Sequence, residues 1–161
     1  MKAILEIPAF ASREELFSPV NEISSDAADS KYMDFSFYEM DLDKEHSIYF
    51  YLLNQIPSYG NESLIDQVIV KAPFCILFLD VDETMSESKN GELFQSYLEK
   101  YSTPIFLVVV KDQQELFLNL SNDPVIKESG STILLLNADD PQSLKTALLE
   151  AMKTLIPSEP G

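Results

Sequence analysis

The chain has 161 residues, of which 45% are hydrophobic and 24% are charged, a composition typical of a globular domain and unlike a disordered or low-complexity protein. Its 27 acidic and 11 basic residues give a formal net charge of −16, which disfavours nucleic acid and anionic membranes as partners. No apolar run reaches the roughly 18–20 residues of a membrane helix, and a single cysteine excludes an internal disulfide. We expect one cytoplasmic domain over residues 1–156, a short flexible tail at 157–161 and no membrane insertion.

The first third of the chain predicts a strand, a helix and a hairpin. The apolar start, 3–7, predicts a strand, and a short apolar stretch at 16–23 predicts a helix. Two extended, aromatic-rich segments follow, 32–42 and 47–53, and the charged turn 43–46 joins them. Two such segments around a polar turn indicate a β-hairpin.

The rest of the chain alternates strand and helix patterns. Three short, continuous apolar runs are typical of strands buried on both faces of a parallel sheet, namely 74–79, 105–110 and 133–136. Stripes with helical spacing predict helices after Asn61, after Gly91 and after Asp140. The expected order is strand, helix, hairpin, helix, strand, helix, strand, helix, strand, helix. This order predicts a three-layer α/β sandwich with a six-stranded, mostly parallel sheet and one antiparallel edge hairpin.

Two aspartates, Asp80 and Asp82, directly follow the first apolar run. The pattern Asp-x-Asp-x-Thr resembles the nucleophile motif of haloacid-dehalogenase-type phosphatases. In that family the first Asp is phosphorylated, the second is the acid/base, and Mg²⁺ is held nearby. Residues i and i+2 of an extended segment share a face, so the spacing suits the chemistry. That family has the motif on its first strand, however, and a solvated loop after a central strand explains the same residues. A magnesium-dependent phosphatase is therefore the alternative function.

The turn after the first strand is where a phosphate-binding α/β protein has its Gly-x4-Gly-Lys-Ser/Thr loop. Here Ile7 and Ser12 occupy the two glycine positions, and Arg13 occupies the lysine position. Glu14 occupies the position of the hydroxyl that binds magnesium. A carboxylate there repels the β- and γ-phosphates of a nucleotide. The pattern therefore predicts that this turn binds no nucleotide cofactor.

The order and length of these elements resemble the Ras-like small GTPases, especially the compact bacterial gliding and polarity GTPases, over nearly the whole chain. Residues 32–35 resemble the strand after switch I, and 77–80 resemble the central strand. Residues 51–55 stand where these GTPases have Asp-x-x-Gly-Gln. Of the guanine-reading Asn-Lys-x-Asp motif only Lys111 is kept, and Gln113 cannot replace the charge-assisted acceptor pair of the aspartate.

The resemblance implies a pseudo-GTPase, in which the fold is kept and the nucleotide motifs are degenerate. It implies no enzymatic activity, no cofactor and no metal site. The function would be a non-catalytic protein–protein interaction or regulatory module. Small GTPases present their switch regions and the adjoining hairpin to partners, so the resemblance points to a roadblock-type regulator or an active small GTPase as the partner.

The corresponding partner surface would lie on the hairpin and the segment after it. Its expected members are Tyr32, Asp34, Tyr38, Glu39, Asp41, Gln55 and Tyr59. A strand at the edge of a sheet accepts a neighbouring strand, and aromatic side chains are enriched at interface cores. The acidic residues would steer a basic partner toward this surface.

Overall fold

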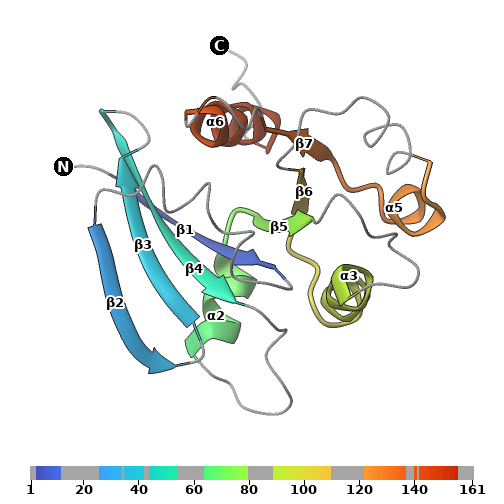
Figure 1. Cartoon of the computed structure of the whole chain (residues 1–161), viewed down its shortest axis with the longest axis horizontal. Coiled ribbons are helices and arrows are strands. Elements are labelled where there is room, and N and C mark those ends of the chain that lie inside the picture. Colours follow the sequence, from blue (N-terminus) through green and yellow to red (C-terminus); the bar gives the residue numbers. More distant parts are fainter. Residues whose placement is uncertain are drawn as a thin grey trace.

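A mixed β-sheet organises the chain in the computed structural model shown in Figure 1. The structure describes residues 3–11, 26–33, 35–41, 44–53, 64–79, 89–109, 122–136, 140 and 142–155. Within this part the sheet has seven strands, in the order β2 (Asp26–Met33), β3 (Phe35–Asp41), β4 (His46–Leu53), β1 (Ala3–Phe10), β5 (Cys75–Leu79), β6 (Ile105–Val109) and β7 (Ile133–Leu135).

Four neighbouring pairs are parallel, namely β4–β1, β1–β5, β5–β6 and β6–β7. The pairs β2–β3 and β3–β4 are antiparallel and form a meander. The central strands β5 and β6 are buried along their whole length. Because both faces of these strands are covered, nearly every residue in them is apolar, which is why their sequences are continuous apolar runs.

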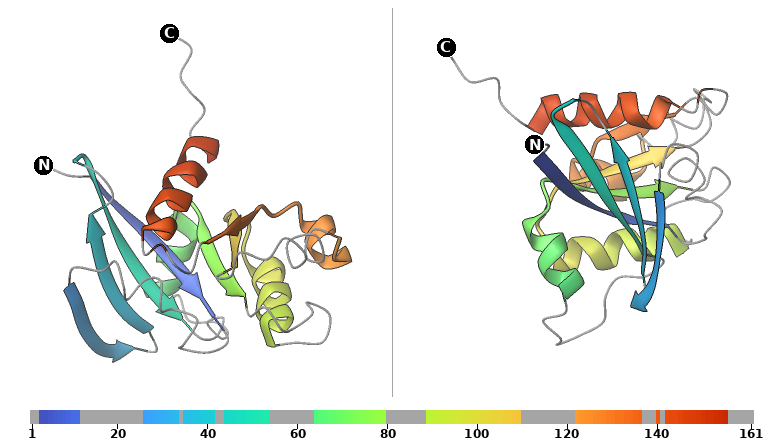
Figure 2. Two further views of the ribbon diagram at one scale, coloured as in Figure 1. Left: turned by 45° about the horizontal axis from the view of Figure 1, so that its top comes forward. Right: turned by 90° about the vertical axis from the view of Figure 1, so that its left-hand side faces the viewer.

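Helices cover both faces of the sheet, as the two views of Figure 2 show. On one face, α6 (Ser143–Leu155) contributes Leu144, Leu148 and Ala151 to a core cluster. On the other face, α2 (Leu64–Lys71) and α3 (Lys89–Lys100) pack with the short α5 (Pro124–Ser129) on a second cluster. The described part of the chain contains no helix that is long and apolar enough to cross a membrane.

Local sequence explains the bounds of α5, the helix that the expected order includes between the last two apolar runs. The side chain of Asp123 accepts a hydrogen bond from the Val125 N–H, with Pro124 in the first turn. Gly130 ends the helix with φ of 70°, in the left-handed region that glycine adopts without steric cost. These capping signals are readable in the sequence.

The structure confirms the predicted α/β sandwich with a mostly parallel sheet and an antiparallel hairpin. The hairpin strands are β3 and β4, which begin and end within a few residues of the expected bounds. The structure adds β2, which pairs with β3, so that β2 rather than the hairpin lies at this edge of the sheet. The predicted helix at 16–23 and the tail at 157–161 lie outside the described residues.

A buried polar cluster joins the helices to the amino end of β5. The Tyr97 hydroxyl of α3 donates a hydrogen bond to the Thr103 carbonyl at 2.6 Å, and the Thr103 hydroxyl donates to the Ile69 carbonyl at 2.8 Å. The Tyr97 ring also packs edge-on against Phe10, with 5.6 Å between centroids. Cys75 lies in the same region, where burial raises the pKa of its thiol to about 12.

A second contact links α2 to α3 at the same end of the sheet. Asp66 of α2 accepts a hydrogen bond from the Tyr101 hydroxyl, and the Lys100 ammonium lies 3.3 Å from the same carboxylate oxygen. Burial and the neighbouring Asp66 carboxylate raise the pKa of Tyr101. The phenol therefore stays protonated at neutral pH and remains a donor to Asp66.

We expect Tyr97→Phe to lower the free energy of unfolding by about 1–2 kcal/mol, because it leaves the Thr103 carbonyl without its donor. The matched control is Tyr51→Phe, which removes a hydroxyl whose bond to Glu6 is exposed. The control should change stability by less than about 0.5 kcal/mol. Urea denaturation followed by circular dichroism measures both, and equal losses in the two variants would contradict the prediction.

Candidate functional site

The carboxyl ends of the parallel strands all lie on the same side of the molecule, as the arrowheads of β5 and β6 show in the right-hand view of Figure 2. Open α/β sheets bind ligands in the crevice outside these ends. A nucleotide site in such a sheet would lie where β1, β5 and β6 end, and β1 runs into the turn at which the phosphate-loop pattern is degenerate.

β1 covers the first four positions of the phosphate-loop pattern, Ile7 to Phe10. Ile7 pairs with Phe50 of β4, and Phe10 pairs with Leu53 on one side and with Leu77 of β5 on the other. All side chains from Ile7 to Ala11 are buried. Ile7 points into the cluster under α6, whereas Phe10 points into the cluster under α2 and α3. The backbone in this segment is a strand that packs on both faces.

The backbone donors of this segment are committed to the sheet. The Ala11 N–H donates to the Leu53 carbonyl at 3.1 Å, one residue beyond the end of β1. Pro8 has no N–H to donate. A phosphate-binding loop works by pointing successive backbone N–H groups at the phosphates. The segment from Pro8 to Ala11 presents no such concavity, because its residues extend the β1–β4 ladder.

The segments that follow the parallel strands in the sequence are strongly acidic. The segments that follow β1, β4, β5, β6 and β7 in the sequence contain 12 acidic and 2 basic residues, a net charge of −10; they are 12–25, 54–63, 80–88, 110–121 and 137–142. Most of the net charge of the chain thus follows the carboxyl ends of the parallel strands.

Most of the residues predicted for the nucleotide or phosphatase site lie outside the described part of the chain. They are Ser12, Arg13, Glu14, Lys111 and Gln113, together with Asp80 and Asp82. Leu79, at the carboxyl end of β5, immediately precedes Asp80. The described residues include no group of three or more His, Cys, Asp or Glu side chains that could hold a metal ion.

The predicted partner residues are divided between the two faces of the meander. Tyr38 is half-buried and packs against the core cluster under α6, so its ring is not a freely exposed anchor. Glu39 is half-buried and Asp41 is exposed; Asp41 accepts a hydrogen bond from the Ser47 hydroxyl at 3.0 Å. Tyr32 lies in β2, and Asp34, Gln55 and Tyr59 lie outside the described residues.

The pairing register places Glu39, a predicted partner residue, beside three side chains that the sequence did not single out for the partner surface. Glu39 of β3 and Glu6 of β1 are both the register partners of Tyr49 of β4, so the three share one face of the sheet. Tyr51 lies on the same face, half-buried, and its hydroxyl donates to the Glu6 carboxylate at 2.9 Å. Burial and this carboxylate raise the pKa of Tyr51. We call Glu6, Glu39, Tyr49 and Tyr51 the acidic–aromatic face.

Comparisons with known proteins establish the fold. No protein family model and no curated protein matches the chain. Among solved structures, it is similar to Era from Aquifex aeolicus bound to GDP and AlF4⁻, with 13% identity and a TM-score of 0.67 over 99% of this chain and 59% of that one. It is also similar to the FeoB G-domain from Methanococcus jannaschii, with 15% identity and a TM-score of 0.54 over 96% of this chain and 98% of that one.

The chain is also similar to the elongation factor SelB from Methanococcus maripaludis in complex with the GTP analogue GppNHp, with 13% identity and a TM-score of 0.56 over 96% of this chain and 34% of that one. The chain thus spans little more than half of Era and about a third of SelB. At these identities the likeness shows the fold alone, which is GTPase-like. None of these structures supports the phosphatase alternative.

Restoring a loop glycine should damage the fold without creating a nucleotide site. Ile7→Gly removes a fully buried side chain from the cluster under α6 and adds backbone freedom, so we expect it to cost about 3–5 kcal/mol. The control is Ile4→Gly in the same strand, where the side chain is 52% exposed and less is lost. Urea denaturation compares the two, and equal costs would contradict the burial argument.

Proposed function

We propose that this chain is a cytoplasmic, non-catalytic protein-interaction module that has a GTPase-like fold and does not bind nucleotide. The observation that carries the proposal is the continuation of β1 through the first four positions of the phosphate-loop pattern, followed by the hydrogen bond from the Ala11 N–H to the Leu53 carbonyl. Ile7 fills a core position at which the phosphate-loop pattern has a glycine. The acidic segments that follow the strands in the sequence also disfavour nucleotide binding, since negative charge repels phosphate groups.

We infer that the acidic–aromatic face, which shares Glu39 with the predicted partner surface, contacts the partner. Glu6 is exposed, and Glu39, Tyr49 and Tyr51 are half-buried, so the face offers aromatic rings beside carboxylates. Tyrosine is enriched at interface hot spots, and carboxylates guide a basic partner into register. We therefore propose a basic protein surface as the partner, and a roadblock-type regulator or an active small GTPase is the class that the family resemblance implies.

The first test is direct measurement of nucleotide binding. Isothermal titration calorimetry of the folded chain with GTP and with GDP, each in the presence of Mg²⁺, should show no binding at micromolar concentration. The physical reason is that the β1 backbone donors are used within the sheet. Circular dichroism before and after the titration checks that the chain is folded. A dissociation constant in the micromolar range or below would contradict the loss of nucleotide binding.

The partner surface is tested by reversing one charge on the acidic–aromatic face. Glu39→Lys should reduce recovery of the partner from the native host by about tenfold, because it places a positive charge against a basic surface. Glu99→Lys makes the same charge change at an exposed site on α3 and is the control. Quantitative mass spectrometry of the captured proteins compares the two. If both variants retain the same proteins as the parent chain, the partner surface lies elsewhere.

A further inference from the structure

The edge strand β7 lies at the opposite end of the sheet from the acidic–aromatic face. In the described part of the chain no strand pairs with its outer side. The Leu107 N–H donates to the Thr132 carbonyl at 2.9 Å, and the Leu136 N–H donates to the Val109 carbonyl at 2.8 Å. Since successive strand residues direct their backbone groups to alternate sides, Ile133 and Leu135 direct theirs toward the outer edge. This edge has the geometry that accepts an added strand.

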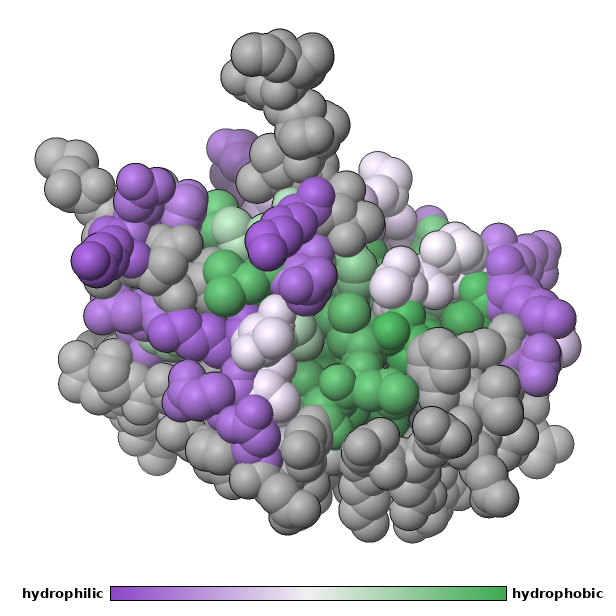
Figure 3. Space-filling model, turned by 90° about the horizontal axis from the view of Figure 1, so that it is seen from above, coloured by the Kyte–Doolittle hydropathy of each residue, from purple (hydrophilic) through white to green (hydrophobic). Residues whose placement is uncertain are grey.

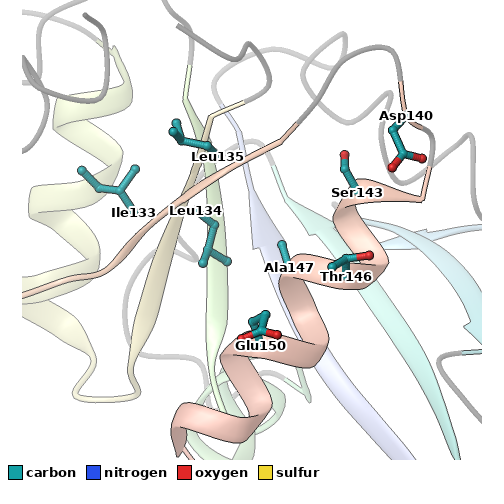
Figure 4. Close-up of a pocket in the computed structure, with 8 residues that line it drawn as sticks. All are labelled: Ile133, Leu134, Leu135, Asp140, Ser143, Thr146, Ala147 and Glu150. Carbon is teal, nitrogen blue, oxygen red and sulfur yellow. The ribbon is translucent and has the colours of Figure 1, made fainter. Parts of the chain in front are cut away.

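A groove of about 460 Å³ runs between β7 and α6. Its apolar lining comes from all three residues of β7 and from Ala147 of α6. Figure 4 shows Leu134 and Ala147 on the two sides of this groove. In Figure 3, which views this side of the molecule, apolar side chains form a continuous patch in the middle of the face. The β7 side chains are only half-buried, so apolar surface remains open to a ligand.

The two charged residues that line the groove are both acidic. Asp140 lies at one end and Glu150 at the other (Figure 4). The Asp140 Oδ1 atom accepts a hydrogen bond from the Gln142 N–H at 2.9 Å, which leaves its second oxygen for another donor. Glu150 lies 4.0 Å from Lys153, but both side chains are more than two-thirds exposed, and such a pair exchanges easily with another cation.

The charges and the spacing select the occupant. From Ser143, the first residue of α6, to Glu150 the helix rises by about 10 Å, and Asp140 lies three residues before Ser143. An extended strand covers about 13 Å in four residues, and residues i and i+4 point to the same face. A second copy of this chain fits poorly, because it is itself acidic and would bring its own Asp140 and Glu150 against the same groove.

We propose that β7 and α6 form a docking groove for an extended segment of a basic partner protein, which adds to the sheet as a strand. The segment carries basic residues at i and i+4, which meet Asp140 and Glu150, and an apolar residue at i+2, which packs on Leu134 and Ala147. This surface is separate from the acidic–aromatic face. The inference does not depend on the proposed loss of nucleotide binding.

The test uses a synthetic peptide as the probe, because its sequence can follow the proposed pattern. The probe is Thr-Lys-Thr-Leu-Thr-Lys-Thr with blocked ends and a fluorescent label, and binding is measured by fluorescence polarisation. A scrambled peptide with adjacent lysines keeps the charge and composition but loses the spacing. A third peptide is N-methylated at every residue, which removes the backbone donors of both edges and prevents strand pairing. We expect the patterned peptide to bind at least tenfold more tightly than either control peptide.

Protein variants locate the site. Asp140→Asn keeps the hydrogen-bond acceptor at the start of α6 and removes the charge, and Glu150→Gln does the same at the other end. Each should weaken binding of the patterned peptide about two- to fivefold, and the double variant about tenfold. Glu99→Gln, on the opposite face of the sheet, is the matched control and should bind as the parent chain does.

Three results would overturn the proposal. The first is equal binding of the patterned and N-methylated peptides, which would exclude strand addition. The second is equal affinity in the double variant and in Glu99→Gln, which would place the peptide elsewhere. The third is self-association of the chain in analytical ultracentrifugation that the double variant strengthens, which would assign the groove to a second copy. Nucleotide titration gives an independent result, so failure here leaves the proposed function standing.

Discussion

The fold depends on the pairing of β1 with a strand on each side. β4 pairs with it along its whole length, and β5 joins at its carboxyl end. Ile7 and Ala9 point to one face and Phe10 to the other, so this strand contributes to both core clusters. A glycine at position 7 would remove a fully buried side chain from the cluster under α6. The packing of the sheet and the shape of the candidate site are therefore consequences of one strand.

Burial on both faces explains which elements were predictable from sequence. The strands β5 and β6 were predicted within one residue because their side chains are all buried, and the result is a continuous apolar run. β2 was missed because its sequence, Asp-Ala-Ala-Asp-Ser-Lys-Tyr-Met, has neither a continuous run nor an apolar alternation. The extension of β1 was missed because Pro8 normally marks the end of a strand, and here pairing on both sides outweighs that tendency.

The sequence showed which residues occupy the positions of the candidate site, but not how their backbone and side chains are arranged. The replacements at the glycine positions follow from the sequence alone, whereas the bond from Ala11 to Leu53 needed the structure. The acidic–aromatic face depends on which residue of β3 lies opposite Tyr49, and a shift of one residue would exchange Glu39 for Tyr38. Spacing along a strand gives the alternation of faces, but the partner strand decides which side chains meet.

Because Cys75 is buried in the centre of the sheet, alkylation of its thiol reports when the packing around β5 opens. It is the only cysteine, and it begins β5, next to Tyr97 and between the two covering layers. A thiol with a pKa near 12 is almost wholly unreactive at neutral pH, and its burial also keeps alkylating reagents out. The labelling rate of the native chain is therefore set by how often β5 separates from α3. A mass-shift measurement over time gives the opening rate when alkylation is faster than reclosing, and the opening equilibrium when it is slower.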